Sequence, residues 1–192
     1  MSITDDASFR LATPAVPHPD APPAGTLLPS HFRRCYGCGP EHQSGLRMRL
    51  TVGENASVHA ELQVTDEHQG APGIAHGGLL SCALDETLGT VAWLLGRPAV
   101  TAQLTTDFRA PVPVGSQLHI HARCTGVAGR KLYLAAEGRI GGQTGTVAVR
   151  ATALFLAVGL DHFAAHGDPA LNRQAMADPE FETFRRAFET DS

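Results

Sequence analysis

A histidine, two glycines and a carboxylate lie within ten residues of one another near the middle of the chain. His76, Gly77 and Gly78 come directly before a run of apolar residues, and Asp85 lies inside that run. If the run is a helix, its first backbone N–H groups lack partners within the helix and lie at the positive end of its dipole. Glycines let a ligand approach such groups closely. The arrangement suits a site that polarises a carbonyl and holds an oxyanion, although a turn requiring small residues is the structural alternative.

Asp85 is the group that would act as a base or nucleophile. It lies in an otherwise apolar segment, where an unpartnered buried carboxylate would be costly. Burial would also raise its pKa toward neutral pH, where a general base is effective. An acid on a solvent-facing side of the helix is the alternative, and Glu86 fits that description better. The residues one and two turns away are small and leave space for a substrate: Gly78, Ser81, Cys82, Gly89 and Ala92.

The element that must hold these residues is a helix. Apolar side chains recur at helical spacing from residue 77 to residue 95, and Gly96 and Pro98 end the segment. Asp85 and Glu86 are the two charged residues in it. A helix that is apolar nearly all round must be buried.

Strands account for most of the remaining middle of the chain. Apolar and polar residues alternate in 58–64 and 118–125, and residues 130–140 and 145–158 are longer candidates joined by a Gly-Gly hairpin. In 101–109 the odd positions are polar, from Thr101 to Asp107 and Arg109, and are expected to share one face that is solvated or lines the site. One buried helix followed by four antiparallel strands predicts an α+β fold, with an antiparallel sheet wrapped around a central helix.

The spacing of His76 and Asp85 predicts a two-fold dimer. Nine residues correspond to about 13 Å along a helix axis and to about two and a half turns, so the two side chains point to opposite sides. One chain therefore cannot bring its own Asp85 to its own helix start. Two chains with antiparallel helices could pair each Asp85 with the other chain's His76, Gly77 and Gly78.

Length and charge indicate one domain with two unlike ends. The 192 residues carry a net charge of −4, distributed as −2 over residues 1–30, +2 over 31–160 and −4 over 161–192. We expect a flexible Pro-rich arm at 1–30, either disordered or draped over the domain, a functional domain at 31–160 and a helical tail at 161–192. In the tail, Asp178 and Pro179 form a helix-start signal, followed by Phe181, Phe184 and Phe188 at helical spacing.

Several classes of function and location are excluded by composition. A nucleic-acid binder usually carries a basic excess, which this chain lacks. No apolar run reaches the length of a membrane span, and the N-terminal residues do not resemble a secretory signal. Four cysteines do not form a disulfide framework, so we expect a reducing, cytoplasmic compartment.

Metal and cofactor signals are weak. Cys35 and Cys38 lie near His31 and His42, but a structural zinc site requires four ligands and the chain has no second cysteine pair nearby. His119 and His121 share a strand face without a third ligand. No dinucleotide-binding loop and no serine-hydrolase elbow are present. We therefore expect neither a metal nor a cofactor.

Three segments carry a resemblance to a known family. Residues 69–78 (QGAPGIAHGG) with Asp85, residues 108–115 (FRAPVPVG), and the segment from Cys35 (CYGCGP) through Gly45-Leu46 resemble the hotdog-fold acyl-CoA thioesterases. The match is to the phenylacetic-acid-degradation (PaaI-like) and THEM-type branch of the 4-hydroxybenzoyl-CoA thioesterase superfamily. It covers about residues 33–158 and leaves both tails unexplained.

The resemblance implies a hotdog fold, homodimers that often pair into tetramers, and an acyl-CoA substrate bound across the dimer interface. By this resemblance Asp85 is the catalytic carboxylate, His76 orders the helix start, and Gly77 or Gly78 donates an N–H to the thioester oxygen. Thr101 would help to position the attacking water. Coenzyme A contacts would fall at Asp107, Arg109, Arg130 and Lys131.

The leading functional hypothesis is hydrolysis of an acyl-CoA thioester to a free acid and CoA. A non-catalytic acyl-CoA binding or sensing module is the first alternative. A hotdog hydratase is the second, but His76 and Asp85 on one helix do not match the pattern of those enzymes. Neither the acyl group nor the choice between coenzyme A and an acyl-carrier protein follows from the sequence.

Overall fold

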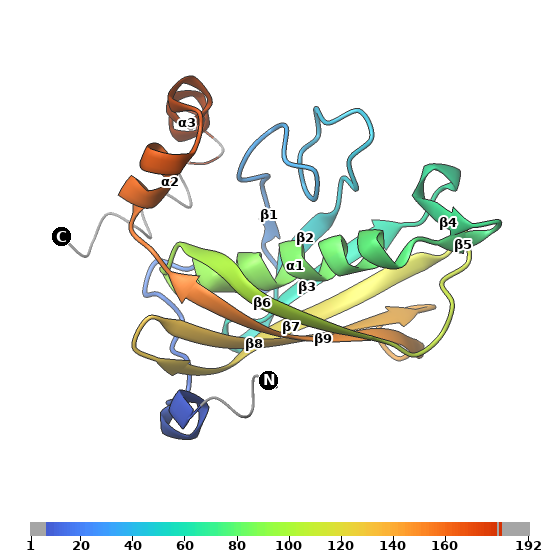
Figure 1. Ribbon diagram of the computed structural model, residues 1–192, viewed down its shortest axis with the longest axis horizontal. Helices are drawn as coiled ribbons and strands as arrows, with labels where there is room; N and C mark the ends of the chain where they lie inside the picture. The colour runs from blue at the N-terminus through green and yellow to red at the C-terminus, as the bar shows by residue number, and fades with distance from the viewer. Residues whose placement is uncertain (1–6, 180, 182–192) are drawn as a thin grey trace.

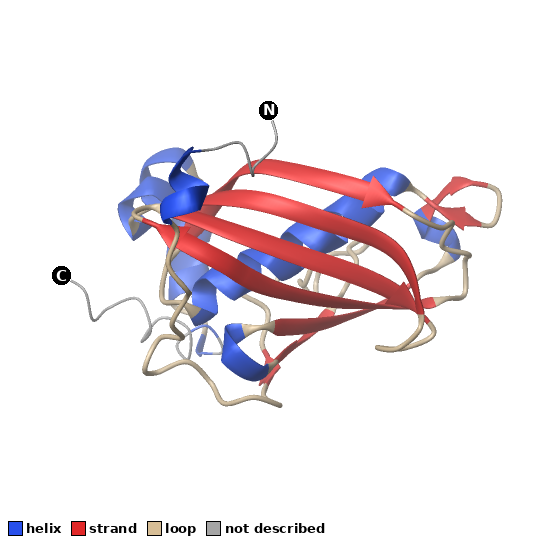
Figure 2. Cartoon of the chain, turned by 90° about the horizontal axis from the view of Figure 1, so that it is seen from below, coloured by secondary structure: helices blue, strands red, loops and turns tan. Residues whose placement is uncertain are grey.

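A seven-stranded antiparallel sheet curves around one long helix (Figures 1 and 2). The computed structural model describes residues 7–179 and residue 181. The spatial order of the strands is β1-β2-β3-β7-β8-β9-β6, with strand β6 at one edge. Their bounds are β1 Leu27–Leu28, β2 Arg49–Val52, β3 Val58–Gln63, β6 Ala99–Phe108, β7 Gln117–Ala128, β8 Lys131–Ile140 and β9 Thr146–Ala157.

Helix α1, Gly77–Leu94, lies against the concave face of this sheet. It begins at the cap residue His76, and the chain leaves it through Leu95 and Gly96, whose φ of 64° favours glycine. Nine of its eighteen residues are buried, among them Leu84, Leu88 and Val91. The predicted architecture, a central helix followed by four antiparallel strands, is confirmed.

Helix α1 is not buried all round, as the apolar sequence suggested. One stripe on it remains at least partly exposed, and apart from Trp93 at its C-terminal end the members are small or acidic: Gly78, Ser81, Cys82, Asp85, Glu86 and Gly89. The sheet covers the opposite side, where the large aliphatic residues pack. The small residues therefore face open space next to edge strand β6.

The core follows the alternation predicted for the strands. In β7 the buried Leu118, Ile120 and Ala122 alternate with the more exposed His119 and His121. In β3, Val58, Ala60 and Leu62 are buried and pair with the same stretch of β7. These apolar faces of the strands pack on α1. The packing holds the half-exposed stripe of the helix in a fixed orientation.

A small hairpin leads the chain into α1. The 3₁₀ turn η4, Asp66–His68, precedes strands β4, Gln69–Ala71, and β5, Ile74–Ala75, which pair with each other. In Figure 1 this hairpin lies at the N-terminal end of α1. A second turn, η3 Glu54–Ala56, connects β2 to β3.

The N-terminal segment lies along the domain over its described part. The 3₁₀ helix η2, Ala7–Leu11, lies by β7, and Thr13 forms a bridge with Val127 of that strand. The N–H of His18 donates to the C=O of Leu94 at 2.9 Å. The proline-rich arm is thus held by backbone hydrogen bonds.

Two short helices follow the last strand. Helix α2 covers Leu160–His166 and helix α3 covers Pro169–Met176. The Asp168 side chain caps α3 by accepting hydrogen bonds from the N–H groups of Ala170 and Leu171. Both helices fall in the segment expected as a helical tail, 161–192, apart from the first residue of α2. Phe181 is buried against Trp93, whereas Phe184 and Phe188 lie outside the described residues. No described helix has the length and apolarity needed to cross a bilayer.

Candidate functional site

The start of α1 is built by the residues on both sides of His76. The N–H of His76 donates to the C=O of His68 at 2.8 Å, which ties the helix start to η4. Gly70 packs directly on His76, because a Cβ at position 70 would lie 2.8 Å from its Cα. These contacts fix the position and direction of the first turn of α1.

His76 satisfies most of the N–H groups in that first turn. Its Nδ1 accepts a hydrogen bond from the N–H of Gly78 at 2.9 Å, and its C=O accepts from Leu79 and Leu80. Among the residues that the structure describes, no acceptor lies opposite the N–H of Gly77. Of the two glycines expected as oxyanion donors, Gly77 thus offers a free N–H, whereas the N–H of Gly78 is engaged.

Asp85 and Thr101 face each other between α1 and β6. The hydroxyl of Thr101 donates a hydrogen bond to Asp85 Oδ1 at 2.8 Å. Burial raises the pKa of Asp85, and the hydrogen bond from Thr101 opposes this shift. The hydroxyl oxygen of Thr101 keeps lone pairs that can accept a hydrogen bond from a water molecule.

The orientation of Thr101 differs from the expectation of simple alternation along its strand. The pairing of β6 with β9 shifts register between Thr101 and Gln103, which makes Ala102 the extra residue of a β-bulge. Thr101 consequently faces α1 together with even-numbered residues further along. Thr106 is one of these, since its hydroxyl lies 3.2 Å from that of Ser81 on α1.

The bulge separates Thr101 from the polar residues expected beside it. Thr105 and Asp107 lie on the outer face of the sheet, where they line a shallow depression with Arg150 and Glu137. Asp107 there forms an ion pair with Arg109. The prediction of a single polar row from Thr101 to Arg109 was therefore wrong. The unpaired residue of the bulge moves every later side chain of the strand to the opposite face of the sheet.

The remaining residues expected to meet coenzyme A lie apart from Asp85. Arg130 donates to the C=O of Ala157 at 3.0 Å, and Lys131 donates to the Ser8 hydroxyl at 2.9 Å. Arg130 lies in the turn between β7 and β8, and Lys131 is the first residue of β8. Within one chain, the structure thus brings together Asp85 with Thr101, and His76 with Gly77, but does not join these two pairs or place the cationic residues beside them.

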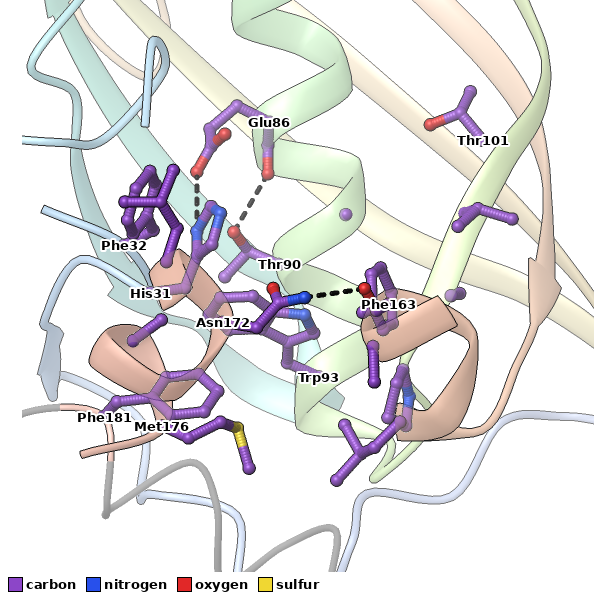
Figure 3. Close-up of a pocket in the computed structure, with 18 of the residues that line it drawn as sticks. His31, Phe32, Glu86, Thr90, Trp93, Thr101, Phe163, Asn172, Met176 and Phe181 are labelled. Carbon is purple, nitrogen blue, oxygen red and sulfur yellow. Dashed lines mark hydrogen bonds and ion pairs between the residues drawn. The ribbon is translucent and has the colours of Figure 1, made fainter. Parts of the chain in front are cut away.

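A cavity of about 820 Å³ opens beside Asp85 and Thr101 (Figure 3). The C-terminal half of α1 forms one wall, through Gly89 and Trp93, and β6 contributes Val100. Helices α2 and α3 cover it with mostly apolar side chains: Leu160, Phe163, Ala164, Leu171, Ala175 and Met176. The side-chain amide of Asn172 donates to the C=O of Phe163 at 2.7 Å and joins the two helices. Sequence reasoning missed this role of the C-terminal tail because the role depends on the folding of α2 and α3 over α1.

A second group of reactive side chains lies beside the same cavity, and two of its members, His31 and Glu86, line it. His31, Cys35 and Cys38 come from the loop before β2 and meet Glu86 of α1. Burial raises the pKa of Glu86 to about 7, with the attraction of His31 opposing that shift. His42 is not part of this group. The sequence analysis considered His31, Cys35 and Cys38 together. It interpreted Glu86, the fourth member, as a solvent-facing acid.

Comparison with known proteins identifies the family. The family model described as "Thioesterase superfamily" matches residues 72–152, which cover α1 and most of strands β6–β9. The acyl-coenzyme A thioesterase THEM4 of Xenopus laevis is 33% identical over 88 residues, which are 46% of this chain and 39% of that protein. The chain thus spans about two fifths of the length of this curated relative.

Solved structures agree with this result. The crystal structure of RHA08564, described as a thioesterase superfamily protein, has a TM-score of 0.61 and 30% identity, covering 71% of this chain and 69% of that one. The structure of smu.793 from Streptococcus mutans bound to acetyl-CoA has a TM-score of 0.51 and 24% identity, covering 54% of this chain and 82% of that one. The chain belongs to the thioesterase superfamily, and its fold is the hotdog fold that the sequence resemblance implied.

Proposed function

We propose that this protein hydrolyses acyl-CoA thioesters, with Asp85 as the general base or nucleophile. The observation that carries the proposal is the hydrogen bond between Asp85 and Thr101 at the mouth of an apolar cavity. A half-buried carboxylate with a raised pKa, held next to a space for an apolar group, is suited to activating water against an acyl carbonyl. The name of the THEM4 relative supports coenzyme A as the thiol carrier.

The proposed active site requires two chains. The free N–H of Gly77 lies at the N-terminal end of α1, whereas the cavity lies by the C-terminal half of the helix. In Figure 1 the N-terminal end of α1 lies beside the β4–β5 hairpin. A second copy with its α1 antiparallel would bring its own helix start to Asp85. Two features support such a neighbour: the stripe of small residues on α1 is half-exposed, and β6 is an edge strand of the sheet. Tetramer formation is compatible with this arrangement but is not required by it.

The chemistry then proceeds through a water molecule held by Asp85 and Thr101. Asp85 takes a proton from the water as the water oxygen attacks the carbonyl carbon of the thioester. The resulting oxyanion accepts a hydrogen bond from the N–H of Gly77 of the partner subunit. When the carbon–sulfur bond breaks, the thiolate of coenzyme A takes the proton from Asp85, and the acid is released. Direct attack by Asp85, followed by hydrolysis of the acyl-enzyme anhydride, uses the same residues.

The cavity beside Asp85 is the proposed acyl site. Its volume of about 820 Å³ and its aromatic and aliphatic lining suit an acyl group considerably larger than acetyl. Because α2 and α3 form much of its lining, the C-terminal tail would take part in acyl selection. The roles of Asp107, Arg109, Arg130 and Lys131 in coenzyme A binding remain proposals; within one chain each of these side chains already has a partner.

The deciding experiment measures free thiol release from a panel of acyl-CoAs that ranges from acetyl to long-chain and aromatic acyl groups. The wild-type protein should release CoA, and Asp85→Asn should lower kcat by about 10²- to 10⁴-fold with the fold intact. Binding of acyl-CoA without release of thiol would favour the non-catalytic module instead. Full activity in Asp85→Asn would remove Asp85 from the mechanism.

A further inference from the structure

Four potential metal ligands converge where the loop before β2 meets α1. The ligand atoms of His31, Cys35, Cys38 and Glu86 all lie within 4.8 Å of one another. Cys38 Sγ lies 3.2 Å from His31 Nδ1, Cys35 Sγ lies 3.3 Å from Glu86 Oε2, and His31 Nδ1 lies 3.5 Å from Glu86 Oε1. In a tetrahedral zinc site with ordinary bond lengths, neighbouring ligand atoms are about 3.3–3.8 Å apart. These three distances are close to that range and all pairs lie within 4.8 Å, so the cluster is close to the dimensions of a tetrahedral site.

The loop is shaped to bring its two cysteines to the same point as Glu86. The N–H of Gly37 donates to Cys35 Sγ at 3.3 Å, and the N–H of Gly39 donates to the C=O of Cys35 at 2.9 Å. A Cβ at position 37 would collide with the Glu86 carboxylate, and one at position 39 with the backbone of Cys35. Both glycines are thus required by the close approach of the loop to the carboxylate and to itself.

The surroundings of the cluster restrain its members. The ring of His31 packs edge-on against Trp93 with centroids 4.5 Å apart, and the Ser30 hydroxyl lies 3.3 Å from Cys38 Sγ. Cys38 is buried, and the other three members are partly buried. Side chains held in place by packing need little rearrangement when a metal binds.

We propose that His31, Cys35, Cys38 and Glu86 bind a zinc ion. Two thiolates, one imidazole and one carboxylate form a donor set that suits zinc better than the oxygen-preferring magnesium or calcium. Because the protein supplies four ligands, no coordination position remains for a substrate, and the site is structural rather than catalytic.

The ion would connect two parts of the chain that lie about fifty residues apart, the loop and α1. His31 and Phe32 of the loop line the cavity, as does Glu86, which is adjacent to Asp85 in α1. Zinc at this point would therefore fix one wall of the cavity relative to the helix that carries Asp85. The proposal does not depend on thioesterase activity, because metal content is measured without any substrate.

The first test is the metal content of the full-length protein, purified in the presence of a reductant and without chelators. We expect about one zinc ion per chain by elemental analysis. After chelation, reloading with cobalt(II) should give the intense visible and near-ultraviolet bands of tetrahedral cobalt with thiolate ligands. A protein that takes up no zinc while all four thiols are reduced would overturn the proposal, as would a stable Cys35–Cys38 disulfide in the protein as purified.

Variants locate the ion within the structure. Cys38→Ala should lose the zinc, while Cys124→Ala should keep it, because Cys124 lies in β7 and its Sγ interacts with the C=O groups of Gly126 and Tyr133. Glu86→Gln should weaken zinc binding by at least about 10- to 100-fold. That is the loss in metal affinity when a residue that only hydrogen-bonds to a metal ligand is removed, and Glu86 is proposed as a ligand itself. The cobalt spectrum of the wild-type protein keeps the test valid even if Cys38→Ala fails to fold. Full zinc content and unchanged affinity in both cluster variants would contradict the assignment.

Discussion

The hydroxyl of Thr101 in β6 donates a hydrogen bond to Asp85 Oδ1 in α1 at 2.8 Å. This bond joins the edge strand to the half-exposed stripe of the helix, and it exists because the bulge at Ala102 turns Thr101 toward α1. The carboxylate is thereby held in one orientation at the mouth of the cavity.

Thr101→Val should lower kcat while leaving the fold intact. The change keeps the shape of the side chain but removes the hydroxyl that orients Asp85. A hydrogen bond to a charged group contributes about 1.5–3 kcal/mol, so kcat should fall by about 10- to 100-fold. Thr105→Val is the matched control, since Thr105 lies on the same strand but on its outer face. Steady-state thiol release measures both variants, and equal rates for the two would argue against the role of Thr101.

Gly77→Pro should remove the proposed oxyanion donor without disturbing the helix. Proline lacks an N–H and is favoured at the first helical position, and His76 before it has the extended backbone, φ −70° and ψ 132°, that proline requires of its predecessor. Removal of one such donor costs about 10²- to 10³-fold in kcat.

Gly77→Ala is the control for this variant, because it introduces a similar Cβ contact with Phe108, at 3.3 Å, but retains the N–H. We expect Gly77→Ala to keep most of the activity of the wild type. An equal loss in the alanine and proline variants would point to packing against Phe108 rather than to the N–H.

Gly89→Leu should shorten the acyl groups that the protein accepts. Gly89 lies one turn after Asp85 and lines the cavity, and a Cβ at this position meets Phe155 at an ordinary 3.7 Å. The added side chain would occupy part of the proposed acyl site. Since one methylene in an apolar pocket is worth about 1–3 kcal/mol, kcat/KM for the largest acyl-CoAs should fall at least about tenfold, and that for acetyl-CoA should change little. Gly89→Ala is the control; an equal loss for all acyl groups in Gly89→Leu would contradict the assignment of the cavity.

Glu137→Gln should destabilise the protein at neutral pH but not in acid. Burial alone would raise the pKa of Glu137, but hydrogen bonds and charges from Arg150 and Arg139 outweigh it and lower the pKa below its ordinary value of 4.5. A carboxylate with a lowered pKa contributes stability that is fully present above the ordinary pKa and disappears as pH falls through the lowered one.

The expected loss in the free energy of unfolding at pH 7 is about 0.2–1 kcal/mol, the range measured for exposed ion pairs. Urea denaturation of the wild type and of Glu137→Gln should show this difference shrinking as the pH falls below 4.5. A difference that grows on acidification would show that the arginines do not hold Glu137 in its ionised form.

Regular periodicity explains how much of the fold could be predicted. The helix expected at 77–95 is α1, Gly77–Leu94, and the four strands after it match β6 to β9 within a few residues. The bulge in β6 could not be predicted, since Ala102 carries no turn signal and the register is set by pairing with β9. The cavity was missed for a similar reason: α2 and α3 form it only by folding back over α1.

Positions within one helix could be predicted from the sequence, whereas contacts between distant segments could not. His76, Gly77 and Asp85 belong to α1 and its cap, so their separation along the helix follows from their spacing, and a site shared between two chains stays a prediction. Glu86 lies 51 residues after Cys35, and its contact with the cysteine loop follows only from the packing of that loop on α1.

In the proposed mechanism, each active site combines Asp85 of one chain with the Gly77 N–H of another. Asp85→Asn and Gly77→Pro each remove one half of the site, and a mixed dimer of the two variants retains one intact site of two. Co-expression of the two inactive variants should therefore restore about a quarter of the wild-type thiol release, the statistical yield when half of the dimers are mixed. Activity that stays at the level of the separate variants, although mixed dimers have formed, would contradict a site shared between chains.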